Sequence, residues 1–386
     1  MGRSPGFIRQ VGCRVLRGSH KSATPATGAS LRSGGIFAAI VMLCAFAPAV
    51  SAGAGGPSDS GTFKVLPPIE RGNLAIFPVV ADRTYDTSQF ITLDEGIHGG
   101  QVVVTEAGDE HGLIRPGQAI PTLQGAEVNR LVLYNNSSHP LLLLAGEIVT
   151  GGKQDRVIGS DRIVPADSGP IDLGVFCVEP GRWVGASSKF GSMGVQMAQP
   201  SVRTPAMAEQ NQLQVWANVR SSNARIANSL TPREAAAVAG TSSYAKVFQS
   251  APVAKLVAGY GGLEAEQAIL HDLRGNGATG VVVAINGQVV WADVFASTDL
   301  LSKYWPKLMR SYVAEAMTSG SNGGAPQLRE AEAFMHTLSG GREVVETQSG
   351  VFRRAEITGD AYRVFELTSL VPKTGYMVHI TKMQEN

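Results

Sequence analysis

Residues 141–156 read Leu141-Leu-Leu-Leu-Ala-Gly-Glu-Ile-Val-Thr-Gly-Gly-Lys-Gln-Asp-Arg156, an apolar run that ends in a charged, glycine-containing turn. Leu141 to Leu144 are apolar on both faces of an extended chain, which suits a central strand covered on both sides. Strand alternation then places Glu147 on the same buried face as Leu141 and Leu143. Because an ionised group that leaves water costs several kcal/mol unless it is paired, this carboxylate needs a partner or a ligand.

Strand-like segments flank this stretch on both sides. Each is rich in apolar and β-branched residues and is bounded by Gly, Asn, Asp or Pro. The predicted strands are residues 74–80, 101–105, 130–134, 140–149 and 171–179, with a short helix at 93–96.

The middle of the chain is predicted to be helical. Residues 206 to about 228 are amphipathic, with Leu213 on the apolar face. A second helix is predicted to start at Thr231-Pro-Arg-Glu234, where Thr231 caps the helix and Glu234 completes a capping box.

The last third of the chain mixes strands with one long helix. Residues 280–295 predict a hairpin that turns on Asn286-Gly287, a dipeptide that suits the positive φ angles of a type I′ turn. A helix follows over 300–317, and Pro306 is expected to open a new helical segment within it. Strands are predicted over 350–357, 361–370 and 376–381.

Together these elements predict an α+β fold in a single domain. Its N-terminal half is rich in strands, its middle is helical, and its C-terminal part mixes strands and helices. The expected organisation is a signal peptide over 1–52, a flexible linker over 53–62 and a folded domain over 63–383.

The N-terminus predicts export. The first 52 residues contain six basic residues, no acidic residue and an unbroken apolar run over 36–47. That run is short for a bilayer span, and Val50-Ser51-Ala52 suits cleavage after Ala52. We therefore expect a periplasmic or extracellular protein, and the alternatives are an uncleaved membrane anchor or a leader extended by a wrong start codon.

Composition argues against several classes of function. Six of the 33 basic residues lie in the leader, so 27 basic residues face 32 acidic ones and the formal charge of the remaining chain is −5. No basic run interleaved with aromatic residues occurs, so nucleic-acid binding is not expected. No two histidines beyond the leader are spaced as a zinc ligand pair, and no metal or other cofactor is expected.

Two charged segments form the candidate site. Gly151 and Gly152 would let backbone amides approach a ligand, and the side chains that follow can donate to phosphate or carboxylate oxygens. The second segment, Phe176-Cys-Val-Glu-Pro-Gly-Arg-Trp183, brings a carboxylate, an arginine and an indole. The predicted catalytic residues are Glu147 and Glu179, and the predicted ligand-binding residues are Gly151, Gly152, Lys153, Gln154, Asp155, Arg156, Arg182 and Trp183.

The same residues admit a structural interpretation. Glu147 or Glu179 can neutralise Lys153 or Arg156 inside the protein. Trp183 would then pack over an arginine.

The thiol and the enzyme-like motifs of the chain point to structural roles. Cys177 has no histidine near it in sequence to act as a base, so a buried core thiol is expected. Gly275-Asn-Gly-Ala-Thr-Gly280 matches the dinucleotide glycine pattern, but it follows a helix and opens a strand, so we interpret it as a loop. Ser243-Tyr-Ala-Lys246 matches the Ser-x-x-Lys motif of penicillin-binding enzymes without the Ser-x-Asn motif that should follow.

Several motifs resemble a known domain family. Gly146-Glu147, Gly152-Lys-Gln-Asp-Arg156, Val164-Pro165 and Cys177-Val-Glu-Pro-Gly-Arg-Trp183 resemble the signature of the ARG and Rhodanese-Phosphatase-superfamily-associated Protein domain. The similarity extends to Gly72-Asn-Leu-Ala-Ile-Phe-Pro78, Ile91-Thr-Leu-Asp-Glu95, Gln214-Val-Trp216 and Trp305-Pro-Lys-Leu308. The family name records association with ADP-ribosylglycohydrolases, so the resemblance implies a link to ADP-ribose or NAD-derived nucleotides.

Two functions remain open, and the sequence does not decide whether the protein is an enzyme. The first is binding or processing of a phosphorylated, nucleotide-like small molecule, with Glu147 or Glu179 as general acid or base if there is a reaction. The alternative is a non-catalytic envelope module whose charged cluster is structural and whose exposed helices bind a partner. The sequence identifies no protein partner, and no membrane association is expected after signal cleavage.

Overall fold

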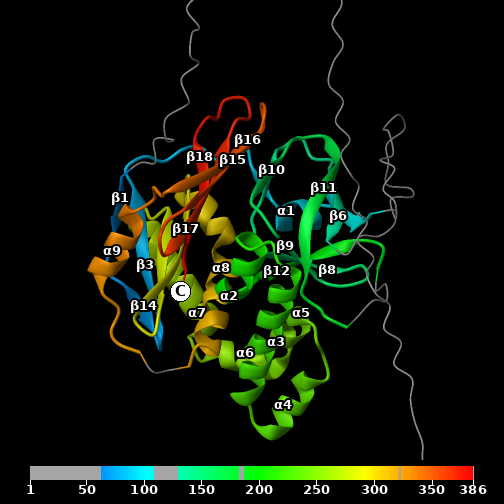
Figure 1. The fold of residues 1–386 in the computed structure, drawn as a ribbon, viewed down its shortest axis with the longest axis vertical. Coiled ribbons are helices and arrows are strands. Elements are labelled where there is room, and N and C mark those ends of the chain that lie inside the picture. Colours follow the sequence, from blue (N-terminus) through cyan, green and yellow to red (C-terminus); the bar gives the residue numbers. More distant parts are fainter. Residues whose placement is uncertain (1–61, 108–128, 182–186, 321–322, 386) are drawn as a thin grey trace, which may run out of the picture. The chain divides into compact units, whose positions relative to one another are not determined.

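The computed structural model describes residues 62–107, 129–181, 187–320 and 323–385 (Figure 1). These residues belong to the compact unit Gly55–Asn386. They form an α+β fold, as predicted. The expected signal peptide and nearly all of the expected linker lie outside the described residues, as do Arg182 and Trp183 of the candidate site.

A nine-stranded antiparallel sheet brings together strands from both ends of this unit. The early strand β3 pairs with β13, and the last strand, β18, pairs with β14. The strand order is β1-β3-β13-β14-β18-β17-β16-β15, with β2 paired to β3. The bounds are β1 Phe63–Val65, β2 Ile69–Arg71, β3 Leu74–Ala81, β13 Gly280–Ile285, β14 Gln288–Phe295, β15 Arg342–Gln348, β16 Phe352–Thr358, β17 Tyr362–Ser369 and β18 Met377–Gln384.

The β13–β14 hairpin at the centre of this sheet forms as predicted. Asn286 and Gly287 have φ angles of 53° and 78°, as a type I′ turn requires. Alternation along β13 buries Val281 in the core that includes α8 (Thr298–Thr318). The next residue, Val282, packs in the core that includes α9 (Leu328–His336). Helices therefore contribute to the cores on both faces of the sheet.

Two smaller sheets build the other strand-rich region. The six-stranded sheet has the order β12-β8-β9-β11-β6-β5, and the three-stranded sheet has the order β10-β7-β4. The bounds are β4 Ile91–Thr92, β5 Val102–Glu106, β6 Arg130–Asn135, β7 Leu141–Leu143, β8 Glu147–Gly151, β9 Arg156–Ile158, β10 Arg162–Val164, β11 Ser168–Cys177 and β12 Phe190–Met197.

The single strand predicted over 140–149 is wrong. The chain bends at Gly146, whose φ is 94°, and β7 and β8 lie in different sheets. In the bend, Leu144 N donates to Glu147 Oε2 at 2.8 Å, and Ala145 N donates to Asp161 Oδ1 at 2.7 Å. In the bend, side-chain carboxylates therefore accept the backbone hydrogen bonds that a neighbouring strand would otherwise accept. The alternation that placed Glu147 on the same face as Leu141 does not continue through the bend.

Helices occupy the middle of the chain. Helix α4 starts with the predicted capping box, in which Thr231 Oγ1 accepts from Glu234 N and Glu234 Oε2 accepts from Thr231 N. The remaining bounds are α1 Leu93–His98, α2 Pro200–Met207, α3 Gln212–Asn228, α4 Pro232–Ala239, α5 Tyr244–Gln249, α6 Ala251–Ala258 and α7 Gly262–Gly275.

The helix expected from residue 206 to about 228 is divided in two. Asn211 caps a new helix, and its side chain accepts hydrogen bonds from Leu213 N and Gln214 N. Because this break changes the phase of the helix, Leu213 is 71% exposed instead of buried.

The expectation for Pro306 is also wrong, because α8 runs through this residue without interruption. Proline removes one helical hydrogen bond, but both faces of α8 are extensively buried and tertiary packing stabilises it. Within the described ranges, no helix combines the length and apolar character needed to cross a membrane.

Candidate functional site

The structure divides the predicted site residues into two groups. Glu147 opens β8 and Gly151 ends it, so the two positions are roughly 13 Å apart along the strand. Glu179 lies just beyond the end of β11, where Cys177 pairs with Arg156. The two predicted catalytic carboxylates therefore belong to different environments at opposite ends of the β8–β9 hairpin.

Glu147 is paired with a lysine that sequence reasoning did not single out as a site residue. Glu147 Oε1 lies 2.6 Å from Lys307 Nζ of α8, and the side chains are 1% and 3% exposed. Lys307 also contacts the carboxylate of Asp94 in α1. Burial raises the pKa of Glu147. Burial opposes the charge on Lys307 too, yet its two carboxylate neighbours raise the pKa of this ammonium. Lys307 therefore remains charged and donates to Glu147 Oε1.

The glycine turn, from Gly151 to Asp155, presents its backbone amides to anionic oxygens. The sequence predicted that these oxygens would belong to a bound ligand. In the structure these oxygens belong to the protein. Gly151 N donates to Asp155 Oδ1 at 3.1 Å, and Lys153 N donates to Glu106 Oε1 at 2.8 Å. Asp155 N donates to Glu179 Oε2 at 3.3 Å. Three side-chain carboxylates thus lie where a bound anion was expected.

Further contacts tie this turn to the helices. Ser243 Oγ donates to Asp155 Oδ2 at 2.8 Å and also caps α5 by accepting from Lys246 N. Ser243 is fully buried, so this residue of the Ser-x-x-Lys motif acts as a helix cap in the fold. Lys246 Nζ lies 3.8 Å from Glu179 Oε1, and the Lys246 side chain is 60% exposed. The predicted residues Asp155, Gln154, Arg156 and Glu179 are therefore brought together.

Glu106 is a member of this cluster that the sequence reasoning missed. It ends β5, one residue past the predicted strand, and it is 2% exposed. Its Oε1 lies 3.8 Å from Nη2 of Arg156, which is fully buried. A carboxylate at the end of an apolar strand was the only sequence signal that could have found it.

Cys177 is a buried thiol, as expected. Its backbone is fixed by Gln212, whose Oε1 accepts from Cys177 N at 2.8 Å and whose Nε2 donates to Cys177 O at 3.0 Å. Burial raises the pKa of this thiol, which lowers its reactivity.

A second buried network centres on Asp293 of β14. Arg203 of α2 donates to both oxygens of Asp293, at 3.0 and 3.1 Å. Burial alone would raise the pKa of Asp293, but the Arg203 guanidinium holds it well below its usual range. His379 Nδ1 of β18 lies 2.6 Å from Asp161 Oδ2, and its Nε2 lies 3.3 Å from Asp293 Oδ1. Two acids and two bases therefore alternate in the core and connect the large sheet to the β9–β10 turn.

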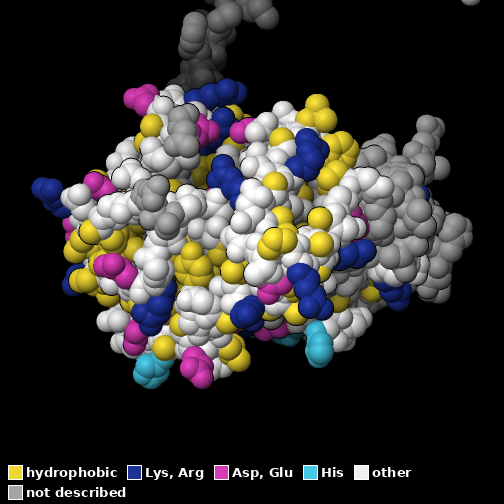
Figure 2. Space-filling model, turned by 90° about the horizontal axis from the view of Figure 1, so that it is seen from below, with side chains coloured by type: hydrophobic (Ala, Val, Ile, Leu, Met, Phe, Trp, Pro, Cys, Tyr) yellow, Lys and Arg dark blue, Asp and Glu magenta, His cyan; other side chains and the backbone are white. Residues whose placement is uncertain are grey.

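The described part of the chain contains no group of three His, Cys, Asp or Glu side chains that could hold a metal ion. On the face shown in Figure 2, basic and acidic side chains are interspersed with hydrophobic ones.

Comparison with known proteins identifies the family. The profile of the ARG and Rhodanese-Phosphatase-superfamily-associated Protein domain matches residues 62–383. This match covers most of the chain, so the protein belongs to that family, as its motifs predicted. No curated protein and no solved structure matched the chain. The family description records an association with other proteins and no reaction.

Two of the motifs that carry the family resemblance meet in the structure, and two of them make further long-range contacts. Glu147 of the Gly146-Glu147 motif pairs with Lys307 of the Trp305-Pro-Lys-Leu308 motif. Trp305 Nε1 donates to Glu266 O at 3.0 Å. Asn73, from the Gly72-to-Pro78 motif, donates to the backbone at the end of α8. Each of these contacts joins elements of the fold that are distant in sequence.

Proposed function

We propose that this chain is a non-catalytic binding module of the cell envelope and that its buried charge clusters are structural. The observation that carries the proposal is the environment of Glu147. This residue is 1% exposed, one carboxylate oxygen pairs with Lys307, and the other accepts from Leu144 N. A general acid or base must come within hydrogen-bond reach of its substrate, and both oxygens of Glu147 already have protein partners.

The glycine turn supports the same proposal. Its amides donate to Asp155, Glu106 and Glu179. A bound phosphate would have to displace these carboxylates and leave them buried without the donors that now stabilise them, which is costly. The turn therefore serves as an internal anchor for the strands around it.

A stability measurement on Glu147→Ala tests this proposal. The substitution removes one of the two carboxylates beside the buried Lys307, and we expect a loss of about 3–5 kcal/mol in the free energy of unfolding. Glu332→Ala on α9 is the control, because Glu332 is partly exposed, and its expected change is within about 0.5 kcal/mol. A Glu147→Ala protein as stable as the wild type would contradict the structural role.

A phosphorylated, nucleotide-like ligand is the second candidate, with an ADP-ribose or NAD link suggested by the family description. The position of Lys246 supports a phosphorylated ligand, because its side chain is 60% exposed to solvent and lies beside the buried Glu179. Gln154 Oε1 also supports a phosphorylated ligand, since this buried atom has no hydrogen-bond partner among the described residues. Both groups could contribute to a small polar site next to the glycine turn.

A thermal-shift screen with ADP-ribose, NAD, nucleotides and sugar phosphates separates the two candidates. A rise in melting temperature that depends on ligand concentration and is absent from Lys153→Ala would favour the ligand site. The structural proposal predicts no shift with any of these compounds. It also predicts that the backbone amide at position 153 still donates to Glu106 in Lys153→Ala, because this contact does not use the side chain.

Export is the last part of the proposal and rests on the composition of residues 1–52. The basic start, the apolar run and the Val50-Ser51-Ala52 end suit a cleaved signal peptide. We expect the mature protein to begin at Gly53 and to be recovered from the periplasm or the medium. N-terminal sequencing after cell fractionation checks this, and an intact N-terminus in the cytoplasmic fraction would contradict it.

A further inference from the structure

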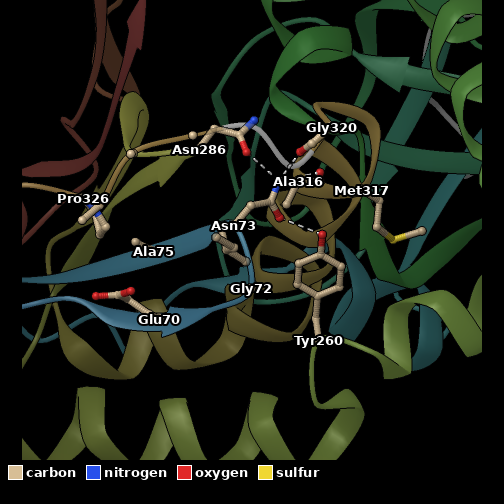
Figure 3. A pocket seen from close by; sticks show the side chains of 15 residues that line it. Glu70, Gly72, Asn73, Ala75, Tyr260, Asn286, Ala316, Met317, Gly320 and Pro326 are labelled. Carbon is tan, nitrogen blue, oxygen red and sulfur yellow. Dashed lines mark hydrogen bonds between the residues drawn. The ribbon is translucent and has the colours of Figure 1, made fainter.

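A cavity of about 620 Å³ lies beside Asn73 (Figure 3). It forms where the β2–β3 turn, the β13–β14 turn and the C-terminal end of α8 meet. Its volume falls in the range of small-molecule sites, about 300–1,000 Å³. The candidate clusters around Glu147 and the glycine turn contribute no residue to its walls.

The walls of this cavity are fixed by hydrogen bonds around Asn73. Its Nδ2 donates to Ala316 O at 3.0 Å, to Gly320 O at 2.7 Å and to Asn286 Oδ1 at 3.2 Å. Tyr260 OH donates to Asn73 Oδ1 at 2.8 Å. The cavity is therefore preformed, which reduces the entropy that a ligand must lose on binding. Because the Asn73 amide is fully engaged, other groups must recognise the ligand.

The charge on the walls has a single sign. Among the described residues that line the cavity, Glu70 is the one charged side chain, and none of them is Lys, Arg or His. Tyr260 stays neutral, because burial raises its pKa. The C-terminal end of α8 adds the partial negative charge of its helix dipole at Ala316 and Met317. The walls therefore favour a positively charged ligand.

The groups that favour a cation are spread along the cavity. In Figure 3, Glu70 and Pro326 lie toward one end, and Tyr260 and Met317 lie toward the other. A carboxylate pairs with an ammonium group, and the face of a tyrosine ring attracts one. An extended molecule with two separated ammonium groups can contact Glu70 at one end of the cavity and Tyr260 at the other.

We infer that this cavity binds a linear aliphatic diamine or polyamine, with one ammonium group at Glu70 and another near Tyr260 and the end of α8. The inference deepens the proposed function and rests on it, because it supplies the site that a binding module requires.

Calorimetric titration of the full-length protein with spermidine and with 1,6-diaminohexane tests the site. 1,6-Hexanediol is the matched uncharged control, and we expect it to bind at least about tenfold more weakly than the diamine. Raising the salt concentration should also weaken diamine binding, because Glu70 is exposed.

Variants at Glu70 locate the binding site. Glu70→Gln should weaken diamine binding by up to about fivefold, as expected for an exposed ion pair. Glu70→Lys places an ammonium at the same wall and should weaken it at least about tenfold. Glu332→Lys makes the same charge change on α9, away from the cavity walls, and should leave the affinity unchanged.

Three results would overturn the inference. They are no heat of binding with either amine, equal affinity for the diamine and the diol, and unchanged diamine affinity in a folded Glu70→Lys protein. Melting temperatures of the variants confirm that they fold. The proposed function fails separately, if Glu147→Ala is as stable as the wild type. That stability measurement uses no ligand, so it does not depend on whether the amines bind.

Discussion

Lys307 Nζ of α8 lies 2.6 Å from Oε1 of Glu147, although the two residues are 160 positions apart in the chain. Both side chains are almost completely removed from solvent. Two sequence motifs that carry the family resemblance therefore meet as one buried ion pair. This pairing explains how a carboxylate tolerates its position beside apolar strands, since breaking a buried pair leaves an uncompensated charge.

The network around His379 predicts a stability that falls at alkaline pH. Burial alone would lower the pKa of His379, but Asp161 and Asp293 raise it to about 9. The folded-state pKa is thus above the unfolded value of about 6.5. Protonated His379 contributes stability fully below that unfolded value, and the contribution is lost as pH rises through about 9. The expected loss is on the order of 3 kcal/mol.

Urea unfolding between about pH 6 and pH 10 measures this loss. The wild type should lose stability steadily across the window, whereas His379→Gln should start less stable and show a much flatter dependence. Parallel profiles for the two proteins would show that another group is responsible.

The glycine turn predicts a backbone effect at Gly152. Its φ is 49°, and an added Cβ would lie 2.2 Å from Phe190 Cζ and 2.8 Å from Glu106 Oε1. Gly152→Ala should therefore cost about 2 kcal/mol or more, from both strain and overlap. Chemical unfolding measures this cost. The control is Gly174→Ala, where an added Cβ meets nothing within 4 Å, and its change should be within about 0.5 kcal/mol. Similar costs at both glycines would contradict the packing described for the turn.

Asn73 predicts a stability effect at the end of α8. Asn73→Ala removes three donor contacts and one acceptor contact, and the orphaned partners should cost about 1–3 kcal/mol. Asn276→Ala removes one exposed hydrogen bond to Asp272 O and should change stability by at most about 0.5 kcal/mol. Thermal unfolding of both variants compares them. Equal melting temperatures would show that the Asn73 contacts are not structural.

Local sequence signals predicted much of the fold. The Asn286-Gly287 dipeptide correctly predicted the central hairpin, and the Thr231 capping box correctly predicted the start of α4. These predictions succeeded because the backbone angles and cap bonds depend on residues within four positions of one another.

Predictions failed where a distant residue decided the local structure. The strand over 140–149 is broken where Ala145 N donates to Asp161, sixteen positions away. For the candidate site, the sequence placed charged residues at the glycine turn and at Glu147 but could not supply the partners Glu106 and Lys307. Those partners come from other elements of the fold, and no local pattern indicates which charges meet.

The most direct test of the structural role is a double-mutant cycle at Glu147 and Lys307. Unfolding free energies would be measured for the wild type, Glu147→Leu, Lys307→Met and the double variant. Each single variant leaves a buried charge with fewer partners and should lose about 3–5 kcal/mol. The double variant replaces the pair with apolar side chains and should lose at least about 2 kcal/mol less than the sum of the single losses. Losses that simply add, or single variants as stable as the wild type, would contradict a structural ion pair at the centre of this fold.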